Sequence, residues 1–258
     1  MSNDLQRIKD TLILVAQEIA CTDLTCLEVT RSEGGDPTTK LDRRINQVIH
    51  QTLPQSDEGW LSEETRDDPV RLACRRLWVV DPIDGTREFV EGIPEWAVSI
   101  GLVMDGQAVA GGVLNPCTGE LFLGATNAGV DLVRLDDREA AASGHRSCLL
   151  VSRREHRENK WRSFEEQGLP IRPVGSIAYR LARVAAGMDL ATCTFEPRSE
   201  WDVAGGVALM NASGGRVETA SGEAIRFNKE VPKLTSFFAF AKDCPPEIPR
   251  LLRNTGRP

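Results

Sequence analysis

The chain has 258 residues, of which 41% are hydrophobic and 27% are charged, and its formal net charge is −7. This composition is ordinary for a folded globular protein, and the acidic balance argues against nucleic-acid polymers as partners, because proteins that bind them usually present a basic face. The first residues lack the pattern of a secretory signal, and no apolar run approaches the roughly 18 residues of a membrane helix. We therefore expect a cytoplasmic protein without a membrane span.

The cysteine and histidine patterns do not indicate several common kinds of site. The seven cysteines are scattered, odd in number and contain no C-x-x-C pair, so neither a disulfide scaffold nor a zinc site is indicated. The three histidines, His50, His145 and His156, have no metal-ligand spacing to one another. A Ser-His-Asp hydrolase is not indicated either, because the sequence contains no G-x-S-x-G motif.

The first half of the chain has the pattern of two helices followed by an antiparallel sheet. Residues 4–20 and 41–53 place apolar side chains at spacings of three and four, which predicts two amphipathic helices. Strand patterns follow, and Asp105-Gly106 gives a strong hairpin signal between two of them. These patterns predict an antiparallel meander whose strands fall within residues 77–80, 95–116, 118–126 and 129–135.

The second half alternates between strand and helix patterns, which is typical of a layered α/β arrangement. The change falls at residues 136–146, a polar stretch rich in alanine that is the best boundary candidate. We therefore expect an N-terminal α+β half at 1–140 and a C-terminal α/β half at 141–258. The predicted strands are 147–153, 171–174 and 189–195, and the predicted helices are 155–167, 176–186 and 201–212, the last ending at Gly214-Gly215.

The stretch "LWVVDPIDGTREF", residues 77–89, carries the strongest functional signal. Asp81 leaves a buried strand, and Pro82 fixes the chain so that the Ile83 carbonyl can face the same point. Asp84 then begins a turn whose first N–H groups belong to Gly85 and Thr86, and such N–H groups bind phosphate. Carboxylates for Mg²⁺ beside N–H groups for phosphate are what a metal-dependent phosphoryl-transfer site requires.

Three other places carry acids that become informative in combination with this stretch. Asp42 lies at the start of the second helix with Thr39 three residues before it, and helix capping explains this pair equally well. Glu63 follows an apolar pair in "WLSEET", and alone it would be a solvated loop residue. Asp202 begins a helix in "SEWDVAGG", where small residues allow the helix to approach its neighbours closely.

Together these motifs resemble the inositol monophosphatase superfamily of Mg²⁺-dependent, typically lithium-sensitive phosphomonoesterases. "DPIDGT" follows an apolar strand, "SEE" lies upstream and "EWDVAGG" lies downstream, so the resemblance covers nearly the whole chain in order. It implies a layered α-β-α-β-α sandwich in which the metals lie near the join of the two halves. It also implies a small phosphorylated metabolite as the substrate and two or three Mg²⁺ ions per site.

The resemblance implies a role for each matching position. A metal-activated water would attack phosphorus, and Asp42 and Thr86 would orient and deprotonate it, with Glu63 also in the catalytic set. Gly85 and Thr86 would donate hydrogen bonds to phosphate oxygens. The implied metal ligands are Glu63, Asp81, the Ile83 carbonyl, Asp84 and Asp202.

Details of the motifs favour one branch of the superfamily. "DGTREF" and "SEE" look like the CysQ-type 3'(2'),5'-bisphosphate nucleotidases, whereas inositol monophosphatases usually read "DGTTNF" and "GEE". The branch hydrolyses 3'-phosphoadenosine 5'-phosphate to AMP and phosphate. Arg180, after Gly175-Ser176, would suit a second phosphate, although a solvated arginine on a helix face explains it equally well. Arg87 could steer an anion or only cover the helix.

Several alternatives stay open on the sequence alone. An inositol-1-monophosphatase is the next alternative, and the segment "DGTREFVEGIPEW" is also similar to histidinol-phosphate phosphatases. A metal-binding module without turnover is disfavoured because Asp42 and Thr86 are both present. Homodimers are common among inositol phosphatases, so a homodimer stays open. Ser152 and Arg153 match a family segment but have no assigned role.

Overall fold

The computed structural model describes residues 3–22, 29–31, 37–136 and 148–254. A six-stranded sheet in the order β3-β4-β5-β6-β7-β8 forms its base, with β3 parallel to β4 and all other neighbours antiparallel. The hairpin predicted at Asp105-Gly106 is confirmed, and both residues have positive φ angles of 51° and 77°. The strands are β3 (Gly59–Ser62), β4 (Arg76–Asp84), β5 (Ala97–Met104), β6 (Gln107–Asn115), β7 (Glu120–Ala125) and β8 (Gly129–Arg134).

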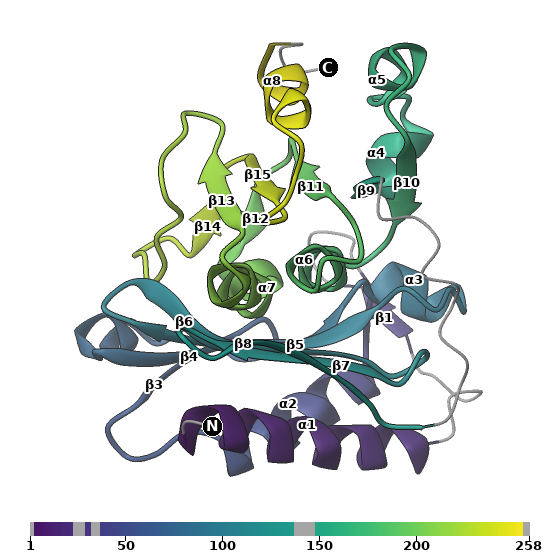
Figure 1. Ribbon diagram of the computed structural model, residues 1–258. Coiled ribbons are helices and arrows are strands. Elements are labelled where there is room, and N and C mark those ends of the chain that lie inside the picture. The colour runs from purple at the N-terminus through teal and green to yellow at the C-terminus, as the bar shows by residue number, and fades with distance from the viewer. Residues whose placement is uncertain (1–2, 23–28, 32–36, 137–147, 255–258) are drawn as a thin grey trace.

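Helices α1 (Asn3–Ala20) and α2 (Lys40–Thr52) cover the lower face of this sheet in Figure 1. The apolar stripe of α1, which includes Ile8 and Leu12, is buried against the sheet. Gly112 of β6 allows this approach, because a Cβ there would lie 2.5 Å from the Ile8 side chain. The two helices predicted for this half of the chain are therefore confirmed, and burial of their apolar faces holds them in place.

Helices α6 (Ile177–Ala185) and α7 (Glu200–Ser213) form the middle layer and cover the other face of the sheet. The small residues of α7 permit close packing, as the sequence predicted. A Cβ on Gly111 would lie 2.5 Å from the Gly205 carbonyl oxygen, so the helix and the strand touch at the backbone. This contact places the N-terminus of α7, with Asp202, beside the end of β4.

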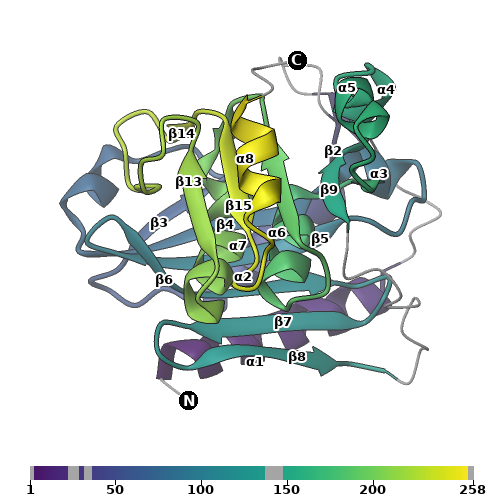
Figure 2. The same cartoon turned by 45° about the horizontal axis from the view of Figure 1, so that its top comes forward.

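A second sheet, in the order β10-β9-β11-β15-β13, lies above the middle helices. Figure 2 shows α8 in front of β15, where Leu252 joins an aromatic cluster with Phe238 and Phe240. Its strands are β9 (Leu149–Ser152), β10 (Ile171–Val174), β11 (Ala191–Thr194), β13 (Arg216–Thr219) and β15 (Phe237–Phe240), and the outer helices are α4 (Arg153–Arg157), α5 (Arg162–Glu166) and α8 (Glu247–Asn254). The layered α-β-α-β-α fold is thus confirmed.

The remaining elements are short. Two small antiparallel pairs and a 3₁₀ helix complete the structure: β1 (Val29–Arg31) with β2 (Pro37–Thr39), β12 (Arg198–Ser199) with β14 (Lys233–Leu234), and η2 (Pro69–Ala73). In the described part of the chain, no helix is long and apolar enough to cross a membrane.

Two expectations differ from the structure, and a third cannot be compared with it. The helix predicted at 155–167 is wrong as a single element, because Asn159 adopts a left-handed conformation with φ 58° and separates α4 from α5. The strand predicted at 77–80 continues to Asp84 through a register shift against β5. The boundary predicted at 136–146 falls almost wholly on residues 137–147, which lie outside the described residues, so the division at residue 140 stays a proposal.

Candidate active site

A cavity of about 510 Å³ opens where the end of β4 meets the starts of α6 and α7. Residues from four further elements line it, namely α3 (Thr86–Val90), β9, α4 and β12. Of the residues singled out by the sequence, all but Asp42 line this one cavity: Glu63, Asp81, Ile83, Asp84, Gly85, Thr86, Arg87, Gly175, Ser176, Arg180 and Asp202.

The corner between β4 and α3 fixes the first acids. The Asp81 carboxylate accepts a hydrogen bond of 3.0 Å from the Ile83 N–H, and the Thr86 hydroxyl donates to the Ile83 carbonyl at 2.9 Å. Gly85 precedes α3 with a φ of 93°, a left-handed conformation that favours glycine. The register shift in β4 and this glycine turn the Asp84 side chain toward the N-terminus of α6.

Asp84 is held by that N-terminus. One carboxylate oxygen accepts hydrogen bonds from the Ser176 hydroxyl at 2.5 Å and from the Ala178 N–H at 2.6 Å. Ser176 also caps α6 by accepting from the Tyr179 N–H at 2.9 Å. The positive end of the helix therefore stabilises an acid that comes from the other half of the chain.

Asp42 and Asp202 each take part in a helix cap. Asp202 accepts from the Ser199 N–H at 3.1 Å, and Asp42 accepts from the Thr39 N–H at 2.8 Å and from the Thr39 hydroxyl. The capping role considered for Asp42 is thus present. Asp42 is 3% exposed and does not line the cavity, and within the residues that are described it shares no hydrogen bond with Thr86.

Three of the acids that line the cavity, Glu63, Asp81 and Asp202, are unusual because their carboxylates lie together, and only Asp81 among them is fully buried. Burial, with the nearby charges of Asp202 and Glu64, raises the pKa of Glu63 to about 8. Burial and the nearby Asp84 raise the pKa of Asp202 to about 7. The pKa of Asp81 is raised by burial and by Glu63. Across the described ranges, none of these three carboxylates forms an ion pair with a lysine or arginine.

The donor set fits a hard divalent cation. Carboxylate oxygens and a backbone carbonyl are the ligands that Mg²⁺ prefers, and a cation would offset the mutual repulsion that raises these pKa values. As they stand, no three of the described acidic, histidine or cysteine side chains form a ready group of metal ligands. Instead, Asp81, Asp84 and Asp202 each accept from an N–H group through a single oxygen.

Arg153 has a defined place beside this site. Its guanidinium donates to both oxygens of Glu95 at 2.6 and 2.7 Å, and Glu95 also accepts from the Gly175 N–H at 2.9 Å. The Glu95 carbonyl accepts from the Ser176 N–H at 3.0 Å. A Cβ on Gly175 would lie 2.5 Å from the Glu88 side chain, so only glycine fits here without a shift. The Glu95–Arg153 pair thus fixes the segment that holds Asp84.

Comparison with known proteins agrees with this arrangement. The model of the inositol monophosphatase family matches residues 4–243. The chain belongs to the inositol monophosphatase family. Its members are phosphatases that are generally metal-dependent, typically with Mg²⁺, and the chain is accordingly a phosphoric monoester hydrolase of this family.

The proteins most relevant to this chain within the family carry different names. The inositol-1-monophosphatase of Mesorhizobium japonicum is 34% identical over 212 residues, which are 76% of this chain and 77% of that protein. The Nus factor SuhB of Pseudomonas aeruginosa is 31% identical over 220 residues, 77% of this chain and 78% of that protein. The crystal structure of CysQ from Bacteroides thetaiotaomicron has a TM-score of 0.76 at 26% identity and covers 94% of this chain and 98% of its own.

In this inositol monophosphatase family member, Arg180 is not on a solvated helix face. It is 1% exposed, and its guanidinium donates to the Thr192 hydroxyl and to the Cys193 carbonyl, each at 3.1 Å. Burial, together with the nearby charge of Arg198, lowers its pKa to about 10. Arg87 is exposed at the rim of the cavity. Both therefore line the cavity, as the sequence predicted.

Sequence reasoning missed several charged residues that line the same cavity. Arg154, Arg157 and Glu158 come from α4 and the residue after it, and Glu88 and Glu91 come from α3 and the residue after it. Arg198 comes from β12, four residues before Asp202. The run "RREHR" at 153–157 was a visible basic signal, but only the fold shows that two of its arginines reach the site.

Proposed function

We propose that this phosphatase releases phosphate from a small phosphorylated metabolite with Mg²⁺ held by Glu63, Asp81, the Ile83 carbonyl, Asp84 and Asp202. The observation that carries the proposal is the group of carboxylates at the wall of one cavity, Glu63, Asp81 and Asp202, which raise one another's pKa values and form no ion pair with a basic side chain among the described residues. Folding alone disfavours such a group, because each carboxylate loses hydration and is repelled by its acidic neighbours, and the hydrogen bonds it accepts do not offset these costs. A bound cation would remove both costs.

The chain's own residues supply the remaining parts of the reaction. The N–H groups of Gly85 and Thr86 donate to the phosphate oxygens and orient the ester. When held by these residues, Mg²⁺ would neutralise charge on the phosphoryl and leaving oxygens and would make water more acidic. Asp42 and Thr86 orient the attacking water and take its proton. Burial raises the pKa of Asp42, which makes its carboxylate a stronger base.

For Thr86 to act on water, its hydroxyl must leave the Ile83 carbonyl, to which it donates here. That change frees the same carbonyl as a ligand for a cation. Asp42 already uses one carboxylate oxygen to cap α2, so its orientation is fixed before any substrate enters. The two residues are therefore proposed to act as a pair whose final hydrogen bond forms when the site is loaded.

At the finer level, we infer a 3'(2'),5'-bisphosphate nucleotidase that converts 3'-phosphoadenosine 5'-phosphate to AMP and phosphate. The sequence details "DGTREF" and "SEE" support this branch, and so does the structural similarity to CysQ. The cavity of about 510 Å³ also lies within the usual size range for sites that hold a drug-sized or nucleotide-sized molecule.

An inositol-1-monophosphatase is the second candidate, because a relative that is 34% identical over most of its length bears that name. The two candidates share the metal ligands and the attacking water, and they differ only in what the rest of the cavity recognises. Substrate comparison therefore separates them without testing the chemistry again.

The experiment is phosphate release from 3'-phosphoadenosine 5'-phosphate, inositol 1-phosphate and histidinol phosphate, compared by kcat/KM with Mg²⁺ and with EDTA. A preference of at least about tenfold for the bisphosphate supports the finer proposal. Preference for inositol 1-phosphate would transfer the assignment to the second candidate. Release that persists in EDTA would contradict the role of the metal, and no release from any ester would leave a module that binds metal without turnover.

A further inference from the structure

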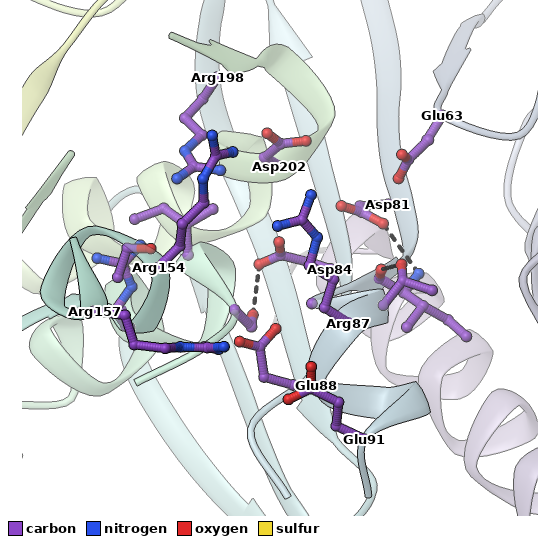
Figure 3. Close-up of a pocket in the computed structure, with 18 of the residues that line it drawn as sticks. Glu63, Asp81, Asp84, Arg87, Glu88, Glu91, Arg154, Arg157, Arg198 and Asp202 are labelled. Carbon is purple, nitrogen blue, oxygen red and sulfur yellow. Dashed lines mark hydrogen bonds between the residues drawn. The ribbon is translucent and has the colours of Figure 1, made fainter. Parts of the chain in front are cut away.

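Three arginines from separate parts of the chain line the active-site cavity: Arg157 on α4, Arg180 on α6 and Arg198 on β12. In Figure 3, Arg157 and Arg198 lie on one side of the view, and Glu63 and Asp81 lie on the other. Arg180 and Arg198 are close enough that the charge of one lowers the pKa of the other. We call these three residues the arginine group.

The arginine group lacks acidic partners. Within the ranges that the structure describes, none of its three members forms an ion pair. Arg180 donates only to a hydroxyl and a carbonyl, and its Nε is buried without a hydrogen-bond partner. Arg198 donates to the Thr194 hydroxyl at 3.4 Å, and the side chain of Arg157 forms no hydrogen bond with any other residue that the structure describes.

Other arginines in the molecule show that this state is not general. Arg153 is bonded to both oxygens of Glu95, and Arg183 is bonded to Asp189 at 2.8 Å. Arg71, which is 2% exposed, is bonded to both oxygens of Asp67. Buried or half-buried guanidinium groups are thus normally paired in this fold, as the cost of an unpaired buried charge requires. The comparison applies to Arg180, which is buried, and to Arg198, which is half-buried, whereas Arg157 is exposed at the cavity.

The carboxylates nearby do not fill this role. Asp84 and Glu155 affect Arg180 through space, and Arg198 lowers the pKa of Asp84 and of Asp202, but none of these pairs is within ion-pair distance. Moreover, Asp84 and Asp202 are the residues proposed to hold Mg²⁺. With a metal bound, their charge would be taken up, and the arginine group would still lack an anionic partner among the described residues.

We propose that the arginine group binds a second phosphoryl group of the substrate while the phosphoryl group that reacts lies at the carboxylates. This inference rests on the proposed function. Guanidinium groups match phosphate oxygens in geometry and stay charged when desolvated. A substrate with one phosphate would place that phosphate at the metal and leave the arginine group without an anionic partner. A bisphosphate would place one phosphate at the metal and the other at the arginine group.

The test compares two substrates that differ only in the second phosphate, 3'-phosphoadenosine 5'-phosphate and adenosine 3'-monophosphate. The variants are Arg157→Gln and Arg198→Gln, assayed at saturating Mg²⁺ so that a change in metal affinity does not affect the comparison. Arg162→Gln is the matched control, because Arg162 is exposed, pairs with Glu166 on α5 and lies outside the cavity.

We expect each variant to lower kcat/KM for the bisphosphate by about tenfold, the usual effect of one charge-assisted hydrogen bond. The loss should fall mainly on KM and should exceed the loss for the monophosphate by at least about fivefold. Equal losses for both substrates, or no loss for the bisphosphate, would overturn the proposal while leaving the phosphatase intact. Absence of turnover in the unaltered protein would instead refute the proposed function.

A binding measurement separates the two sites without turnover. In EDTA the carboxylates repel phosphate, so AMP, which keeps the second phosphate, should bind through the arginine group alone. Calorimetry should show that AMP binds more tightly than adenosine, and that Arg157→Gln weakens AMP about tenfold without changing adenosine binding to the same extent. Equal affinity for AMP and adenosine in the metal-free protein would contradict the proposal.

Discussion

Two sets of carboxylates in this molecule have opposite surroundings. Glu58 lies where α1 meets the first sheet, with 2% of its side chain exposed. Arg7, Arg76 and the Trp78 indole N–H donate to it at 2.7 to 2.8 Å. Burial alone would raise the pKa of Glu58, but these three donors outweigh burial and lower the pKa to about 2.

At the cavity, Glu63 and Asp202 form no ion pair with a basic side chain among the residues that the structure describes. Burial and neighbouring acids raise the pKa of Glu63 to about 8 and that of Asp202 to about 7. Arginines therefore form hydrogen-bonded ion pairs with Glu58, whose role is structural. No arginine forms an ion pair with the described carboxylates that are proposed to bind a cation. The comparison shows why the absence of a basic partner indicates a cation site here: another carboxylate of the same structure does have such partners.

The largest expected effect is on activity. Asp84→Asn should lower kcat on the order of a thousandfold, because the amide keeps the shape and the acceptor oxygen but loses the charge proposed to hold Mg²⁺. Steady-state phosphate release at several Mg²⁺ concentrations measures the loss. Asp105→Asn is the control, since Asp105 is 63% exposed in a hairpin turn and pairs only with Arg75 among the described residues. A fully active Asp84→Asn variant with normal Mg²⁺ dependence would contradict the assignment.

Thr86→Ala should have the next largest effect. Removing the hydroxyl should lower kcat by about a hundredfold, the usual contribution of a positioned proton-transfer group. The Mg²⁺ concentration at half-maximal activity should change little, because the implied ligand at that corner is the Ile83 carbonyl. If turnover and apparent Mg²⁺ affinity fall by equal factors, Thr86 supports the metal site and is not part of the water-activating pair.

Glu58→Gln should affect stability and leave the site intact. It breaks a buried network with two arginines, which should lower the free energy of unfolding by about 2 to 3 kcal/mol. Urea unfolding at neutral pH measures this change, and kcat/KM under native conditions should match that of the unaltered protein. A loss of activity without a loss of stability would show that the two sets of carboxylates do not have separate roles.

The smallest expected effect is a pH dependence of opposite sign for the two sets. Glu58 binds fewer protons when folded, so its contribution to stability is present above pH about 4.5 and is lost as the pH falls toward 2. Glu63 and Asp202 bind more protons when folded, so in EDTA the stability should decline as the pH rises from their ordinary pKa values of 4.5 and 3.8 to the raised values of about 8 and about 7, and should level off above them.

Thermal unfolding in EDTA between pH 5.5 and pH 8.5 tests the decline of stability expected from Glu63 and Asp202. The Tm should fall across that range, and Mg²⁺ should remove the decline because a bound cation replaces the protons. Asp202→Asn should show a shallower decline than the unaltered protein. A Tm that rises or stays level in EDTA would mean that these carboxylates already have basic partners in solution.

The sequence predicted those parts of the fold and site that depend on contiguous patterns. Neighbouring residues in the sequence determine the apolar faces of α1 and α2, the hairpin at Asp105-Gly106 and the acids around "DPIDGT". The structure places Asp81 and Asp84 at one cavity. The same local reasoning failed at Asn159, where a single left-handed residue ends a helix whose periodicity continues.

The arginine side of the cavity could not be predicted in the same way. Arg157 and Arg198 are 41 positions apart in the sequence. Only the fold, which packs α4 against β9 and β12 against α7, brings both side chains to one cavity. Neither position differs in its local pattern from an ordinary surface arginine. Arg180 was identified through its place after Gly175-Ser176, but its burial and its contacts with β11 depend on the second sheet.

The central claim, that the clustered carboxylates of the cavity form a cation site, is tested most directly by binding. The measurement is a calorimetric titration of Mg²⁺ into the metal-free chain at pH 8, repeated with Asp81→Asn and with the Glu58→Gln control. The account predicts saturable binding that Asp81→Asn weakens by at least about tenfold and that Glu58→Gln leaves unchanged. Absence of Mg²⁺ binding, or binding that Asp81→Asn does not weaken, would contradict it.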